Sequence, residues 1–273
     1  MKVIELETQS SLVFYLHGLR GHALSQQAAL RQIIKQTGDR VVCLELPGHG
    51  PDSLNEQCMV PKLELLLTDI VNEIKARACS AEQVVLMGYS FGAALMCLAA
   101  RELEQDETFK AKIAGFVGIS SALDVAHNVP AWQLALAGLI APVSRWLHRS
   151  SRVMSRWLTI SEMKIDLISP DPAVRRNIAN DPLTYKGRIP LNTSAQVYLA
   201  SLAARTALDE LRCDVLLVHS IDDAIAKVPD RAWWSKHIDL RLFKTLRHNC
   251  IDGMVREAAL ARRAIVQFLQ STR

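Results

Sequence analysis

A serine in a glycine-flanked turn is the strongest chemical signal in the sequence. Residues 88–92 read Gly-Tyr-Ser-Phe-Gly, between an apolar run at 83–87 and a strongly helix-forming run at 93–100. A Gly-x-Ser-x-Gly turn between a strand and a helix strains the serine backbone, and its glycines avoid Cβ clashes with neighbouring elements. The helix N-terminus adds a free N–H group and a dipole that favours negative charge. This context predicts that Ser90 is a nucleophile.

A serine hydroxyl is a weak nucleophile and needs a base that a carboxylate orients. In this turn context the acid and then the histidine follow the serine along the chain. Asp222 and Asp223 come just after an apolar run at 213–218, and His248 follows the last predicted strand. His248 is therefore the predicted base. Position alone leaves both aspartates open as the acid.

Acyl transfer through a serine also needs hydrogen-bond donors for the oxyanion that forms. One donor is expected from the N–H group of Phe91, directly after the serine. A second glycine-bounded loop, at 17–22, follows an apolar run at 11–16, and such loops leave backbone N–H groups directed at a ligand. We expect the N–H group of Leu19 in this loop to be the second donor.

Strand and helix patterns alternate along most of the chain. Strands are predicted at 11–16, 40–46, 83–87, 113–119, 213–218 and 240–243, and helices at 23–36, 63–74, 93–100 and 255–269. This alternation predicts the α/β class with a mostly parallel, doubly wound sheet that binds ligands at the carboxyl ends of its strands. It stops at 123–206, which we interpret as an inserted helical cap. The catalytic core would then comprise 1–122 and 207–273.

Composition narrows the class of protein further. A chain of 273 residues, 49% hydrophobic, can bury one large core, and a net charge of +4 without a basic stripe argues against nucleic acid as a partner. Its six cysteines show no metal-ligand spacing, so no metal is expected. The N-terminus lacks the apolar region of a signal peptide, and no apolar run approaches the ~20 residues that cross a bilayer. Together these features predict a cytoplasmic protein.

Several segments resemble the monoacylglycerol lipase and lysophospholipase group of the α/β-hydrolase superfamily, its serine-aminopeptidase-like branch. They read HGLRGH at 17–22, LPGHG at 46–50, GYSFGA at 88–93, HSIDDAI at 219–225 and RHN at 247–249. The runs ISPDPAV at 168–174 and NDPLTYKG at 180–187 are similar to the cap of monoacylglycerol lipases. The likeness therefore covers nearly the whole chain, and it implies the α/β-hydrolase fold.

The resemblance also implies roles for single residues. The family's G-x-x-D motif puts the acid at Asp223, with Ser220 in place of the usual glycine, and the family's first oxyanion donor falls on Leu19. His22 matches a family position near the polar end of the substrate, so it is a candidate for substrate binding. Tyr89, beside the serine, and Trp132, in the predicted cap, are further candidates for substrate binding.

The predicted cap allows two interpretations. An apolar face is possible at helical spacing, followed by basic residues: Trp132, Leu136, Leu139, Ile140 and Val143, then Arg145, His148, Arg149 and Arg152. This pattern is typical of an amphipathic lid that touches a membrane transiently and admits an acyl chain. It equally suits a helix packed on the catalytic core with solvated arginines.

These observations predict a serine ester hydrolase that works through an acyl-enzyme, without cofactor or metal. The resemblance and the apolar cap favour monoacyl lipids (monoacylglycerols or lysophospholipids) or other medium-to-long acyl esters as substrates. A short-chain carboxylesterase or thioesterase is the alternative enzyme. A hydrolase-fold protein that only binds ligands is disfavoured, because such a protein has no need of a serine, a histidine and an acid together. A peptidase is disfavoured because we identify no acidic cluster for a substrate amine.

Overall fold

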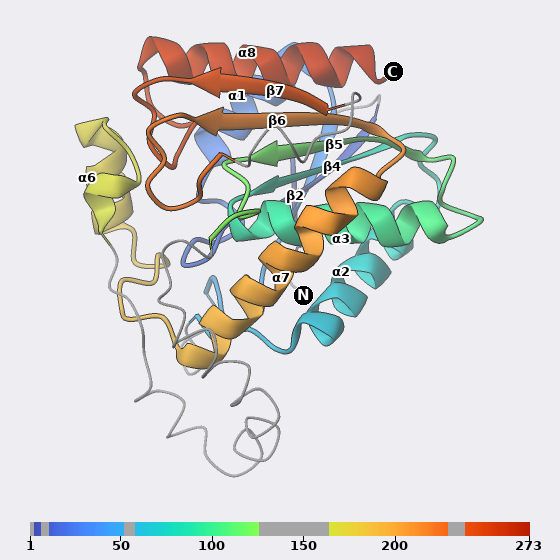
Figure 1. Ribbon diagram of the computed structural model, residues 1–273. Helices are drawn as coiled ribbons and strands as arrows, with labels where there is room; N and C mark the ends of the chain where they lie inside the picture. Colours follow the sequence, from blue (N-terminus) through green and yellow to red (C-terminus); the bar gives the residue numbers. More distant parts are fainter. Residues whose placement is uncertain (1–2, 7–10, 52–57, 126–163, 229–237) are drawn as a thin grey trace.

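The computed structural model describes residues 3–6, 11–51, 58–125, 164–228 and 238–273. These residues build one sheet in the order β1-β3-β2-β4-β5-β6-β7 (Figure 1). β1 runs antiparallel to β3, and every other pairing is parallel. The strands are β1 (Val3–Leu6), β2 (Leu12–Leu16), β3 (Arg40–Leu44), β4 (Val84–Tyr89), β5 (Ile113–Ile119), β6 (Asp214–Ser220) and β7 (Ile238–Phe243).

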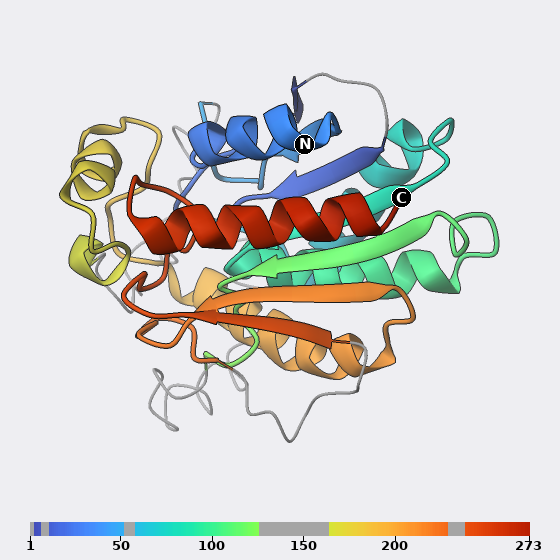
Figure 2. The ribbon, with the colours of Figure 1, turned by 90° about the horizontal axis from the view of Figure 1, so that it is seen from above.

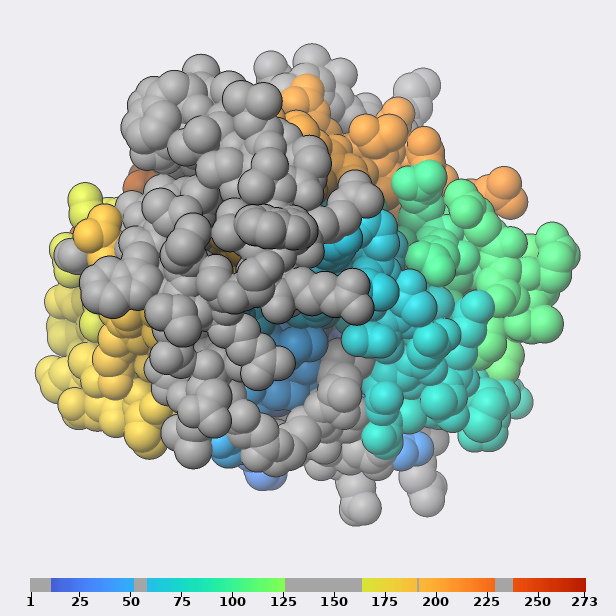
Figure 3. Space-filling model, turned by 90° about the horizontal axis from the view of Figure 1, so that it is seen from below, coloured from blue at the N-terminus to red at the C-terminus, as the bar shows by residue number. Residues whose placement is uncertain are grey.

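Helices cover both faces of the sheet. α1 (Gln27–Thr37) and α8 (Arg256–Ser271) lie side by side on one face, as Figures 1 and 2 show. α2 (Leu63–Arg77), α3 (Phe91–Gln105) and α7 (Leu191–Glu210) lie on the other. Figure 3 shows that second side from outside, with cyan and green surface from the part of the chain that includes α2. The predicted doubly wound, mostly parallel sheet is therefore confirmed.

The central strands are apolar throughout because both of their faces are covered. In β2, Phe14 and Leu16 point into the layer beneath α2, α3 and α7, whereas Val13 and Tyr15 point into the layer beneath α1 and α8. All four side chains are fully buried. Because the strands are parallel, their carboxyl ends meet at one edge of the sheet, where the loops that follow them gather.

Two local features differ from the sequence prediction. The first helix begins at Gln27 instead of residue 23, because the preceding backbone makes other bonds: Ala23 N donates to the Glu45 carboxylate and Ser25 N to the His22 carbonyl. Strand β1 was not predicted. It has only four residues and depends on its pairing with β3, so local sequence carries little signal for it.

Part of the predicted cap lies within the described residues. It contains the short 3₁₀ helix η2 (Ile165–Leu167) and α6 (Pro172–Asn180), which lies near the carboxyl ends of the strands (Figure 1). The predicted amphipathic pattern and Trp132 fall outside the described residues. α7 crosses the predicted boundary at 206/207, and its buried Ala204 and Ala207 belong to the core layer that contains α3. The division into core and cap stays a prediction.

No helix in the described ranges is long and apolar enough to cross a bilayer. The cytoplasmic location and the transient membrane contact remain predictions.

The first turn of α3 lies directly on the end of β2. A Cβ atom on Gly92 would come within 2.3 Å of the carbonyl oxygens of both Leu16 and His17, and a Cβ on Gly88 would lie 2.5 Å from the Gly92 oxygen. All of these obstacles are backbone atoms, which no side-chain rotation can clear. The predicted reason for the two glycines is therefore confirmed.

Replacing Gly92 by alanine tests this contact. We expect a loss of about 3 kcal/mol or more in the free energy of unfolding, because α3 must move away from β2. Gly38→Ala is the control: Gly38 has a positive φ, 73°, which Gly92 does not, but a Cβ there meets nothing within 4 Å. Its cost should be only the left-handed strain, about 1 kcal/mol. Urea unfolding followed by circular dichroism measures both, and equal losses would contradict the close approach.

Candidate active site

Ser90 occupies the turn between β4 and α3. Its φ of 54° and ψ of −118° confirm the strained conformation predicted for it. Hydrogen bonds hold the turn: Ser90 N donates to Ile119 O (2.9 Å), and Ser90 O accepts from Ala122 N (3.1 Å). The serine hydroxyl is thereby presented at the edge of the sheet where the strands end.

The His248 ring reaches Ser90 from the segment after β7. Its Nε2 lies 2.8 Å from Ser90 Oγ, and the side chain is buried. Two backbone N–H groups, those of His248 and Asn249, donate to the carbonyls of Leu167 and Ile168 at 3.4 and 2.7 Å. The loop that carries the histidine is therefore attached to η2.

Asp223 lies behind the histidine. Its Oδ2 is 2.8 Å from His248 Nδ1, and its Oδ1 accepts hydrogen bonds from Ile225 N (2.8 Å) and Ala226 N (3.0 Å). Burial alone would raise the pKa of Asp223, but the charge and hydrogen bond of His248 together with the two N–H donors lower it. The ionised carboxylate favours the proton on Nδ1, which leaves Nε2 to accept from the serine hydroxyl.

The neighbouring Asp222 points elsewhere. It is exposed, and its Oδ2 accepts a hydrogen bond from Thr245 N at 2.8 Å. The two aspartates that position alone could not separate thus have different surroundings: Asp223 contacts His248, and Asp222 ties the loop after β6 to the loop after β7.

A second buried histidine, His219, lies close to this group. Burial lowers the pKa of His219 to about 4, and the nearby Asp223 only partly opposes that shift. The ring is therefore neutral at pH 7. Neither of its nitrogens is bonded to Asp223, so His219 does not share that carboxylate with His248.

The two residues predicted to supply oxyanion donors, Leu19 and Phe91, line the same cavity as Ser90. Within the described ranges neither the Leu19 N–H nor the Phe91 N–H has a hydrogen-bond partner, whereas the amides of Arg20 and Gly21 are both used. Two free N–H groups beside a serine hydroxyl suit a developing negative charge.

The cavity has a volume of about 820 Å³, which lies within the range of small-molecule sites. Ser90 and His248 lie on its wall. Much of the remaining wall is apolar and comes from α6, α7, the segments beside them and the loop after β6: Leu167, Ile168, Val174, Ile178, Ile189, Val197, Tyr198 and Ile225.

The three residues predicted to bind substrate have different outcomes. Tyr89 lines the cavity, and its ring centre lies 5.2 Å from that of His248. His22 instead makes contacts within the protein: Nε2 lies 2.7 Å from Asp181 Oδ2, and Nδ1 accepts from Leu24 N at 3.3 Å. His22 itself is not among the lining residues, whereas its partner Asp181 is, so a role in substrate binding stays a prediction. Trp132 lies outside the described residues.

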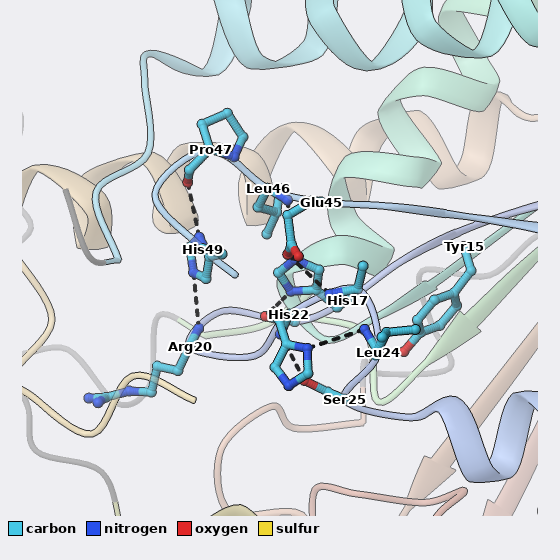
Figure 4. Close-up of polar contacts among 12 residues, drawn as sticks. Tyr15, His17, Arg20, His22, Leu24, Ser25, Glu45, Leu46, Pro47 and His49 are labelled. Carbon is cyan, nitrogen blue, oxygen red and sulfur yellow. Dashed lines mark hydrogen bonds and ion pairs between the residues drawn. The ribbon is translucent and has the colours of Figure 1, made fainter. Parts of the chain in front are cut away.

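Sequence reasoning missed a polar cluster beneath the loop at 17–22. Glu45 and His49 come from the segment after β3. Glu45 contacts His17 and Ala23 at the two ends of this loop, and His49 contacts Arg20 within it (Figure 4). Glu45 and His49 lie in or beside the LPGHG segment, but nothing in the sequence shows that their side chains point toward residues 20–23.

Comparisons with known proteins agree with the fold. The sequence matches the family model described as "Serine aminopeptidase, S33" over residues 7–252. No curated protein matches the chain. Among solved structures, a monoacylglycerol lipase from Paleococcus ferrophilus has a TM-score of 0.78 at 21% identity, covering 100% of both chains. 

Two further structures share the fold. A soluble variant of monoglyceride lipase from Saccharomyces cerevisiae, in complex with a substrate analog, has a TM-score of 0.75 at 15% identity, covering 99% of this chain and 92% of the other. A carboxyl esterase from Bacillus coagulans, in complex with glycerol, has a TM-score of 0.74 at 14% identity, covering 99% and 94%. The chain thus belongs to the serine aminopeptidase S33 family of α/β hydrolases and is a serine hydrolase.

Proposed function

We propose that the protein hydrolyses esters that carry a single acyl chain, with monoacylglycerols and lysophospholipids as the preferred class. The observation that carries this proposal is the chain of hydrogen bonds from Ser90 Oγ through His248 to Asp223, which borders a largely apolar cavity of about 820 Å³. Family membership is compatible with such an activity.

In the proposed reaction Ser90 Oγ attacks the ester carbonyl while His248 Nε2 takes the hydroxyl proton. Asp223 stabilises the imidazolium ion that results. The N–H groups of Leu19 and Phe91 hold the oxyanion, and each such donor is worth about 10²–10³ in kcat. His248 then returns the proton to the leaving alcohol, and a water molecule hydrolyses the acyl-enzyme with His248 again as the base.

The apolar wall supports an acyl chain as the part of the substrate that is recognised. Side chains such as Val174, Ile178 and Val197 offer aliphatic contacts and no hydrogen bonds. Each methylene that leaves water contributes up to about 0.8 kcal/mol. Two of the solved structures with this fold are named as a monoacylglycerol lipase and a monoglyceride lipase, and this likeness is consistent with the proposal.

A short-chain carboxylesterase or thioesterase is the second candidate, since a carboxyl esterase has the same fold. The two candidates share the triad and differ in how much of the apolar wall the substrate uses. Dependence of the rate on chain length separates them.

Hydrolysis of an ester panel from acetyl to long-chain monoacylglycerol and lysophospholipid tests the proposal. We expect kcat/KM to rise by up to about fourfold per methylene until the apolar wall is filled. Ser90→Ala is the control and should remove the activity without lowering the melting temperature. Activity confined to short acyl chains would favour the second candidate. No hydrolysis of any ester by the folded protein would overturn both.

The two aspartates provide a matched pair for the acid. Asp223→Asn should lower kcat by about 10³–10⁴-fold, because an amide can neither stabilise the imidazolium ion nor hold the required tautomer. Asp222→Asn retains an oxygen for Thr245 N, so we expect a change of less than about threefold. Steady-state kinetics on one ester measures both. Equal losses, or a larger loss at Asp222, would show that Asp223 is not the acid.

A further inference from the structure

We propose that Glu45 and His49 are positioning residues that hold the oxyanion loop, residues 17–23, so that its Leu19 N–H stays free for the substrate. This inference rests on the proposed function, because it assigns a reason for one of the two oxyanion donors. Neither side chain is among those that line the cavity at Ser90, so both would act through the backbone of the loop.

Most amides of the oxyanion loop are already in use, and Figure 4 shows the bond between Arg20 and His49. Arg20 N donates to His49 Nε2 (3.2 Å) and Gly21 N to Gly18 O (3.2 Å). His22 N donates to Ser25 Oγ (2.7 Å) and Ala23 N to Glu45 Oε1 (3.0 Å). In the described part of the chain, the amide of Leu19 has no such partner. These bonds therefore occupy the amides that follow Leu19 and leave the Leu19 N–H, which the reaction needs, free.

Arg20 is the strained point of the loop. Its φ is 71°, in the left-handed region that costs a residue with a side chain about 1–2 kcal/mol. The Arg20 N–H and the Leu19 carbonyl belong to the same planar peptide group. The hydrogen bond to His49 therefore fixes the orientation of this group, which directly follows the Leu19 N–H. A left-handed turn at this point therefore depends on an acceptor at the place of His49 Nε2.

The His49 ring is in the tautomer that accepts a hydrogen bond at Nε2. Its Nδ1 donates to Pro47 O at 3.0 Å, which leaves Nε2 without a proton. Burial, followed by the charge that the adjacent His17 can carry, lowers the pKa of His49 to about 3. The ring is therefore neutral under assay conditions, and Nε2 remains available to the Arg20 N–H.

Glu45 ties both ends of the loop together. Its Oε1 accepts from Ala23 N and also lies 2.6 Å from His17 Nε2. His17 Nδ1 faces the Gly18 carbonyl at 2.8 Å and must carry a proton to donate there. Nε2 of the same ring accepts from Leu46 N at 3.1 Å, so the Glu45 carboxylate and the backbone beside it both hold His17 in place. The side chains of Glu45 and His17 are both buried.

A matched pair of substitutions at His49 tests the proposal. His49→Gln keeps a carbonyl oxygen that can accept from Arg20 N, whereas His49→Leu has a similar volume and no acceptor. We expect His49→Leu to lower kcat by about 10–100-fold with KM changed less than about threefold, and His49→Gln to restore most of kcat. Such a split is typical of a donor that acts in the transition state.

A second readout needs no ester substrate. An alkyl fluorophosphonate forms a bond between its phosphorus and Ser90 Oγ and releases fluoride, with the serine proton passing to His248, and its phosphoryl oxygen needs the same donors. The labelling rate should fall about 10–100-fold in His49→Leu and less than about threefold in His49→Gln. Wild-type protein that is labelled but hydrolyses no ester would overturn the proposed substrate class, while the labelling rates would still test the role of His49.

Other outcomes would overturn the inference. Unchanged kcat and labelling in a folded His49→Leu variant would show that the acceptor is dispensable. Equal losses in the leucine and glutamine variants, with kcat and KM changing together, would show a purely structural role. If His49→Leu does not fold, Glu45→Gln replaces it: that variant should lower the labelling rate about tenfold, and an unchanged rate would contradict the proposal.

Discussion

The close contact between the first turn of α3 and the end of β2 is the constraint on which the candidate active site depends. Gly92 lies on the carbonyl oxygens of Leu16 and His17 with no room for a Cβ atom. Because Ser90 directly precedes this helix and His17 begins the oxyanion loop, one contact brings the serine and the loop to the same place. A larger residue at 92 would separate the proposed nucleophile from its proposed oxyanion donor.

The remaining groups arrive from loops that follow parallel strands. The loop after β6 carries Asp223, and the loop after β7 carries His248. Parallel pairing places the ends of these strands side by side, so their loops converge without long connections. Hydrogen bonds then refine the arrangement: Asp222 accepts from Thr245 N, and Ser220 Oγ from Leu246 N, and both bonds join the two loops. The sheet sets the coarse position and these bonds set the side-chain directions.

Much of this could be predicted from the sequence because the signals are local. Ser90 has its glycines and its helix within a few residues, and His248 directly follows an apolar strand. The choice between Asp222 and Asp223 could not be made from position, since it depends on which carboxylate points inward at the end of β6. The resemblance favoured Asp223, which is the aspartate that contacts His248.

Contacts between distant segments were beyond local reasoning. The His22 ring bonds to Asp181, 159 residues further along the chain, a contact that no local pattern could indicate. Glu45 and His49 carry no signal of their direction either, because neither the register of β3 nor the path of the loop at 17–23 can be read from residue types. Short-range patterns therefore predicted the proposed reacting groups, and the groups proposed to support them required the structure.

The attachment of the His248 loop to η2 limits how this chain can evolve. The backbone of His248 and Asn249 bonds to the carbonyls of Leu167 and Ile168, in the part of the chain that also forms the cavity wall. An insertion or deletion at 164–168 would therefore alter the alignment of the proposed base as well as the shape of the wall. Variation in substrate preference is easier to acquire by exchanging side chains in this segment than by changing its length.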